Sequence, residues 1–101
     1  VEGQGLLTGA NDRQNPEFDF LEISPNPFQE SISIGLNFEK EGDYEVTLLD
    51  ATGKTLAVVL KGRNQLGSLA ASFDGRHLPQ GVYFIRVKGQ RQIGYAKLIK
   101  G

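Results

Sequence analysis

The sequence is poorest in the residues on which protein chemistry most often depends. Its 101 residues contain no cysteine, no tryptophan and a single histidine, His77. Without cysteine there is neither a disulfide framework nor a thiolate nucleophile, and one histidine alone does not make a zinc site. The absence of tryptophan also weakens the case for a sugar-binding platform. We therefore predict no bound metal and no cofactor.

Long hydrophobic runs are absent as well. The longest unbroken apolar run covers residues 56–60, whereas a membrane-spanning helix needs about 20 apolar residues. No stretch shows helical periodicity, and no glycine-rich phosphate loop joins a strand to a helix. The first residues do not resemble a signal peptide, so an exported parent protein would carry its signal outside this segment. We expect no direct insertion into a membrane.

Acidic and basic residues are divided unevenly along the chain. Residues 1–50 contain eleven acidic and two basic side chains, residues 51–101 contain one and nine, and the two halves carry about −9 and +8 although the net charge is −1. The near-zero total argues against a nucleic-acid partner. Two interpretations of the division remain open. Early and late strands can pair their charges at ~0.2–1 kcal/mol each, or the domain can dock on an oppositely charged partner.

A catalytic site is not supported by the titratable residues. His77 lies in a glycine- and proline-flanked loop, and a Ser-His-Asp site would need it beside Asp74 and a serine such as Ser68 or Ser72. A lone histidine in a loop is most often a solvated side chain, so we predict no catalytic residue and no enzyme.

An acidic cluster could suggest calcium, but its spacing is wrong. Its carboxylates lack the positions and the glycine of a calcium-binding loop. They are interpreted instead as a solvated strand face and turn. The cluster consists of Glu39, Glu41, Asp43 and Glu45.

The first 17 residues read as a flexible linker. Glycine, asparagine and proline are frequent there, and only Leu6 and Leu7 are strongly apolar. We predict that residues 1–17 connect a preceding cargo domain to a folded domain at 18–101. Leu6 and Leu7 could instead end the last strand of that preceding domain.

From Phe18 onward, apolar and polar residues alternate with a period of two, which is typical of half-buried strands. We predict a turn at 40–43, a second at 50–53 with Asp50 first and Gly53 last, and loops at 63–67 and 74–81. Tyr44 and Tyr83 fall on inward positions, and Tyr95 is ambiguous. The predicted strands are residues 19–24, 31–38, 43–48, 56–60, 69–73, 83–88 and 93–99.

Seven short strands with regular turn signals predict an all-β fold, a seven-stranded antiparallel immunoglobulin-like β-sandwich. Only the architecture is predicted, because the two cysteines and the tryptophan of true immunoglobulin domains are missing.

Three short motifs stand out in the folded region, and each also has a purely structural explanation. Residues 24–28 read Ser-Pro-Asn-Pro-Phe, in which the two prolines fix φ on both sides of Asn26 and predict a rigid, extended corner. Residues 50–54 read Asp-Ala-Thr-Gly-Lys, a turn. Residues 78–83 read Leu-Pro-Gln-Gly-Val-Tyr, a rigid loop entering a strand.

In this order, and followed by an apolar strand carrying lysines, the motifs resemble the C-terminal sorting domains of the type IX secretion system (Por secretion system) of Gram-negative bacteria. The resemblance covers about residues 20–100, and those domains are similar seven-stranded sandwiches. The positions that match, and that the resemblance marks as recognition residues, are Pro25, Asn26, Pro27, Asp50, Gly53, Lys54, Leu78, Pro79, Gly81, Tyr83, Lys97 and Lys100.

The resemblance implies a signal domain rather than an enzyme. Such a domain directs a larger cargo protein through the outer-membrane type IX translocon, in contact with shuttle proteins, and a surface sortase-like peptidase then removes it. The protein would pass through the periplasm and end at the outer-membrane surface or be secreted. A weak homodimer is compatible with this role. On this reading the cut falls within residues 3–17, and Lys97 and Lys100 contact the translocon. The alternative is an immunoglobulin-like spacer or adhesion module of a cell-surface protein.

Overall fold

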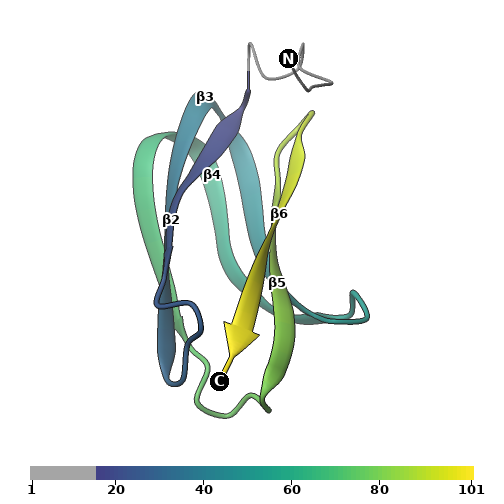
Figure 1. The fold of residues 1–101 in the computed structure, drawn as a ribbon. Helices are drawn as coiled ribbons and strands as arrows, with labels where there is room; N and C mark the ends of the chain where they lie inside the picture. Colours follow the sequence, from purple (N-terminus) through teal and green to yellow (C-terminus); the bar gives the residue numbers. More distant parts are fainter. Residues whose placement is uncertain (1–15) are drawn as a thin grey trace, which may run out of the picture.

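The computed structural model describes residues 16–101 and shows an all-β fold (Figure 1). Every pairing between these strands is antiparallel, which confirms the all-β, antiparallel part of the predicted fold class. Within residues 16–101 no helix is long and apolar enough to cross a membrane. The strands are β2 (Phe18–Ser24), β3 (Ser31–Asp50), β4 (Thr55–Asp74), β5 (Gly81–Lys88) and β6 (Ile93–Lys100).

The prediction of seven strands is wrong for the described residues, which form five. β3 and β4 each run for 20 residues, and each contains two of the predicted strands. The turn expected at 40–43 and the loop expected at 63–67 lie inside these long strands. The two strands stay paired through the bend, where the register shifts between Phe38 and Tyr44. Irregular pairing of this kind bends a strand sharply without ending it.

The bends in β3 and β4 curl the sheet so that its two halves face each other (Figure 1). In the first half, residues 31–38 of β3 lie between β2 and residues 67–74 of β4. In the second half, residues 45–50 of β3 lie between the beginning of β4 and β5, and β6 pairs with β5. The first half therefore orders its strands β2-β3-β4, and the second half β4-β3-β5-β6.

The core lies between the two halves and follows the predicted alternation in β3 and β5, but not at residues 56–60, where Leu56 and Val58 are exposed. Ile34 from the first half, and Val46 and Ile85 from the second, are completely buried. Burial of such a side chain contributes about 1.5–3 kcal/mol. Tyr44 and Tyr83 are core residues as predicted, and the hydroxyl group of each donates a hydrogen bond to a backbone carbonyl oxygen.

The turn between β3 and β4 forms as its sequence predicts. The Asp50 carboxylate oxygen Oδ1 accepts hydrogen bonds from the backbone N–H groups of Thr52 at 2.9 Å and Lys54 at 3.0 Å, and from the Thr52 hydroxyl at 2.6 Å. These bonds lower the pKa of Asp50. Gly53 has φ of 91°, a left-handed conformation that side chains with a Cβ atom adopt only at a cost.

The substitution Gly53→Ala should lower the free energy of unfolding by about 1–2 kcal/mol, because alanine is strained at this φ. Urea denaturation followed by circular dichroism measures the change. Gly35→Ala is the matched control. A Cβ atom there would meet its nearest neighbours at 3.6 Å, an ordinary contact, and stability should stay the same or rise slightly. Equal losses for both variants would contradict the assignment of strain to Gly53.

Candidate recognition surface

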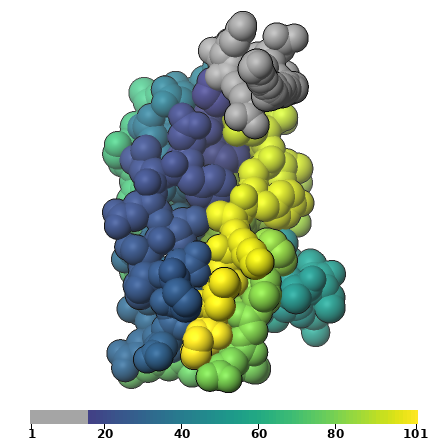
Figure 2. All heavy atoms as spheres, viewed as in Figure 1, coloured from purple at the N-terminus to yellow at the C-terminus, as the bar shows by residue number. Residues whose placement is uncertain are grey.

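Three of the four motif segments meet at one end of the molecule, and the fourth, the turn at 50–54, projects to the side (Figure 1). Asp50 at the end of β3 pairs with Tyr83 of β5, and Gly81 at the start of β5 pairs with Lys100 at the end of β6. The corner after β2 lies against the last residues of β6, as Figure 2 shows for the dark blue and yellow segments. The corner at 25–27, the loop at 78–81 and the last residues of β6 therefore form one continuous end surface.

Asn26 attaches the corner to the edge of β6. Its side-chain nitrogen Nδ2 donates to the carbonyl oxygen of Lys97 at 3.1 Å, and its oxygen Oδ1 accepts from the N–H of Ile99 at 3.0 Å. A side-chain amide has one donor end and one acceptor end, so this pair of bonds imitates the pairing of a neighbouring strand.

Phe28 continues the same pairing with its backbone. Its N–H donates to the carbonyl oxygen of Ile99 at 2.8 Å, and its carbonyl oxygen accepts from the N–H of Gly101 at 2.9 Å. The contact is a parallel bridge between Phe28 and Lys100. The edge of β6 near residues 97–101 is therefore occupied, and this part of the edge cannot accept a partner strand.

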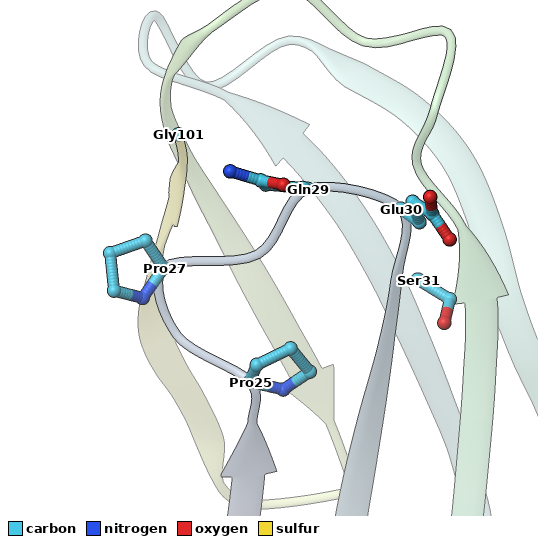
Figure 3. Close-up of a pocket in the computed structure, with 6 residues that line it drawn as sticks. All are labelled: Pro25, Pro27, Gln29, Glu30, Ser31 and Gly101. Atoms are coloured by element: carbon cyan, nitrogen blue, oxygen red, sulfur yellow. The ribbon is translucent and has the colours of Figure 1, made fainter.

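The two prolines of the corner face outward. The chain bends at residues 25–27 instead of running extended as the sequence suggested, because the side chain of Asn26 is held on β6. Pro25 and Pro27 are exposed, and both are preceded by cis peptide bonds. With Glu30 and Gly101 they border an open, shallow hollow (Figure 3).

The ring of Phe28 fills the end of the core. It is fully buried and packs edge-on against Phe73 and Tyr83, with ring centroids 6.3 and 6.5 Å apart. Gly75 lies directly against it, since a Cβ atom at Gly75 would come within 2.6 Å of the ring. This close approach explains why a glycine stands at the beginning of the loop before β5.

The two lysines of the last strand have different surroundings. Lys97 is exposed, whereas Lys100 is only 8% exposed. The ammonium group of Lys100 donates to the carbonyl oxygen of Gly75 at 2.5 Å and lies 5.6 Å from the centroid of the Phe28 ring. A cation over an aromatic face is attracted by about 0.5–2 kcal/mol. Lys100 therefore joins the corner, the loop and the last strand from inside.

The loop leading to β5 is held by short-range contacts. The N–H of Leu78 donates to the carbonyl oxygen of Gly75 at 3.0 Å, and the Tyr83 hydroxyl donates to the carbonyl oxygen of Pro79 at 2.6 Å. Leu78 packs against the core, while Pro79 and Gly81 are exposed. The Leu-Pro-x-Gly-x-Tyr pattern therefore combines buried anchors at both ends with an exposed middle.

Within residues 16–101, the residues considered for catalysis form no hydrogen bonds with one another. His77 is exposed, and the carboxylate of Asp74 is engaged by Arg76, whose Nη2 lies 2.8 Å from Oδ2. This guanidinium lowers the pKa of Asp74 to about 2. Ser68 and Ser72 lie further back along β4 and are exposed.

The acidic cluster is spread along the bend of β3. Asp43 accepts the N–H of Asn64 at 3.1 Å, and Glu39 accepts the side chain of Asn37 at 2.6 Å. In residues 16–101, no group of three potential ligands is arranged to hold a metal ion.

Sequence reasoning missed the role of Glu17, which was placed at the end of the linker. Its side chain is 9% exposed, and its oxygen Oε1 accepts the N–H groups of Arg91 at 2.9 Å and Gln92 at 2.8 Å. A buried glutamate before a strand gives no periodic signal, so only the structure shows it. The predicted cut lies within residues 3–17, and residues 1–15 of that segment are outside the described residues.

Comparison with known proteins agrees with this arrangement of motifs. A family model described as the secretion system C-terminal sorting domain matches residues 22–101. The match begins within β2 and includes the whole end surface. No curated protein matches the chain.

The substitution Asn26→Ala should lower the free energy of unfolding by about 1–2 kcal/mol, because two hydrogen bonds to β6 are lost. It should also speed amide hydrogen exchange at Ile99, which NMR detects residue by residue. Gln29→Ala, an exposed neighbour on the same segment, should change neither quantity. Unchanged exchange at Ile99 in Asn26→Ala would show that the side chain does not hold the edge.

The stability of the loop at 74–81 should depend on pH through Asp74, and the direction of its pKa shift gives the sign. Its pKa is lowered from 3.8 to about 2, so its bond to Arg76 stabilises the loop fully above the unfolded-state pKa near 3.8. That contribution is lost as the pH falls through about 2. A carboxyl carbon-13 NMR titration should give a midpoint near 2 for the native chain. Arg76→Gln should raise the midpoint toward 3.8, whereas Lys88→Gln should leave it in place.

Proposed function

The chain belongs to the family of type IX secretion C-terminal sorting domains, and on that premise we propose that it carries a larger cargo protein through the outer-membrane translocon. A domain of this family is a sorting signal for export to the cell surface or the medium, and the family is not one of enzymes. In the proposed route the protein passes through the periplasm, meets shuttle proteins at the outer membrane, and loses the domain to a surface sortase-like peptidase.

One observation supports recognition of the folded domain rather than of a linear peptide. The corner at 25–27, the loop at 78–81 and the last strand are separated in sequence but joined through Asn26, Phe28 and Lys100. A receptor that contacts the exposed prolines therefore contacts a surface that exists only when all three segments are in place. Deletion of any one of them disturbs the other two.

The position of the proposed cut follows from the contacts of Glu17. Its carbonyl oxygen accepts N–H groups of Glu39 at 2.7 Å and Lys40 at 3.2 Å, and its own N–H donates to the Gln92 side chain at 2.7 Å. Peptidases bind extended backbone whose hydrogen-bonding groups are free. We place the cut before Glu17, within the linker segment 3–17 that the sequence indicated.

An export assay tests the proposal directly. The 101-residue chain is fused to the C-terminus of a periplasmic reporter, in a host with the secretion system and in a strain without its translocon. The reporter should reach the surface or medium only in the first strain, with the new N-terminus of the released domain before Glu17. A reporter that remains periplasmic in both strains would overturn the proposal and favour a spacer or adhesion module.

Alanine variants of Lys97 and Lys100 should show, in the same assay, which lysine acts in recognition and which in folding. Lys100→Ala should lower the free energy of unfolding by about 1–3 kcal/mol, because the carbonyl oxygen of Gly75 loses its buried partner. In the native chain the ammonium group of Lys97 is exposed and available to the translocon. Lys97→Ala should therefore leave thermal unfolding unchanged but reduce export. Normal export of Lys97→Ala would exclude Lys97 as a contact, and an unchanged stability of Lys100→Ala would exclude its structural role.

A further inference from the structure

One outward-facing surface of the domain carries several exposed apolar side chains. On β5, Tyr83, Ile85 and Val87 point into the core, so the residues between them lie on the opposite side of the sheet. Register places Val82 beside Ile99. It also places Arg86 beside Tyr95. These side chains define the outer face of β5 and β6, the two strands labelled at the right of Figure 1.

The apolar side chains of this outer face are well exposed. Tyr95 is 58% exposed, Ile93 52% and Ile99 40%, and Val82 adjoins Ile99. Exposed apolar side chains that adjoin one another on a single face mark an interaction surface more often than isolated ones do. Tyrosine and arginine are also the residues that most often contribute strongly to binding between proteins.

The outer face is positively charged. Arg86, Lys88 and Lys97 alternate with its apolar residues, and Glu45 of the neighbouring strand lies beside Lys88 in the register. In the part of the chain that the structure describes, Asp74 and Arg76 form a salt bridge, but Glu45 forms none. Within residues 16–101, Arg86, Lys88 and Lys97 therefore form no salt bridge on this face.

Arg86 carries a donor that has no partner within the described residues. Its Nε atom is buried and makes no hydrogen bond in residues 16–101, and the same holds for Oγ1 of Thr47. Thr47 and Arg86 are paired across β3 and β5, so both unsatisfied atoms belong to one spot beside Tyr95. Because Nε is buried, an incoming carboxylate would have to meet the terminal nitrogens Nη1 and Nη2, which can donate two parallel hydrogen bonds to it.

We propose that the outer face of β5 and β6 binds an acidic protein surface, with Tyr95 as the apolar anchor and Arg86 and Lys97 facing carboxylates. The idea that this face docks on the secretion machinery rests on the proposed function. A second copy of the chain is a poor occupant, because a symmetric contact would set Arg86 and Lys97 against the same cations. A lipid surface also fits poorly, because the cations lie among the apolar side chains of a sheet face rather than around a protruding tip.

The test combines export with cross-linking in the host that carries the secretion system. Reporter fusions of the full chain are compared as native sequence, Tyr95→Ala, Lys97→Glu and Leu21→Ala. Leu21 is the matched control, since it is also 58% exposed but lies on β2. In parallel, a photoreactive phenylalanine analogue replaces Tyr95 or Leu21, and the adducts are identified by mass spectrometry.

The inference requires that Tyr95→Ala and Lys97→Glu slow export about tenfold or more, the usual effect at a central contact. Their thermal unfolding should be unchanged. Leu21→Ala should be exported at the native rate. The inference also requires an adduct at position 95, absent at position 21, with an acidic surface of another protein. Export at the native rate in both variants would overturn the inference and leave the proposed function intact. Adducts at position 95 with a second copy, or with lipid alone, would overturn it as well. If even the native fusion stays in the periplasm, the proposed function fails, and the adduct at position 95 alone decides whether the face binds an acidic protein.

Discussion

The attachment of residues 26–28 to the edge of β6 is the contact on which the rest of the end surface depends. β2 and β6 are the outermost strands of the path that joins them through β3 and β5. The side chain of Asn26 and the backbone of Phe28 bridge the gap between them with four hydrogen bonds. The bridge places the Phe28 ring in the core, and that ring in turn positions Lys100 and excludes any side chain at Gly75.

The sequence predicted the strands well but not where they end. Alternation of apolar and polar residues located the inward side chains of β3 and β5, because burial imposes that alternation directly. It failed at 56–60, where Leu56 and Val58 are exposed. The same pattern does not show whether two consecutive strands are separated by a turn or joined into one long strand. Gly42 and Gly67 look like turn residues, yet both lie within long strands whose pairing is irregular there. Whether a chain ends in a turn or continues through a bend depends on how it pairs with the neighbouring strand. The register of that pairing cannot be derived from the alternation in one sequence.

The motif residues were found from their order, but their individual roles were not. Proline and glycine have local effects, so the turn at Asp50 could be predicted from neighbouring residues alone. The corner at Pro25 was located in the same way, but it was expected to be extended and is bent. The task of Asn26 depends on Lys97 and Ile99, more than 70 residues away. Lysine is usually exposed, which is why Lys100 seemed equivalent to Lys97. Its burial follows from an aromatic ring and a carbonyl group that only the fold brings to it.

The end surface and the outer face of β5 and β6 differ in how far their polar groups are already satisfied. Hydrogen bonds at the end surface use up the backbone edge of β6, so a partner gains little there by adding a strand. The adjoining face has the opposite character, because its side chains and the Nε group of Arg86 remain without partners in residues 16–101. β6 belongs to both, since its inward residues secure the fold and its outward residues Tyr95 and Lys97 are exposed. Recognition through that face would therefore depend on correct folding of this domain, because an unfolded chain does not bring these side chains together.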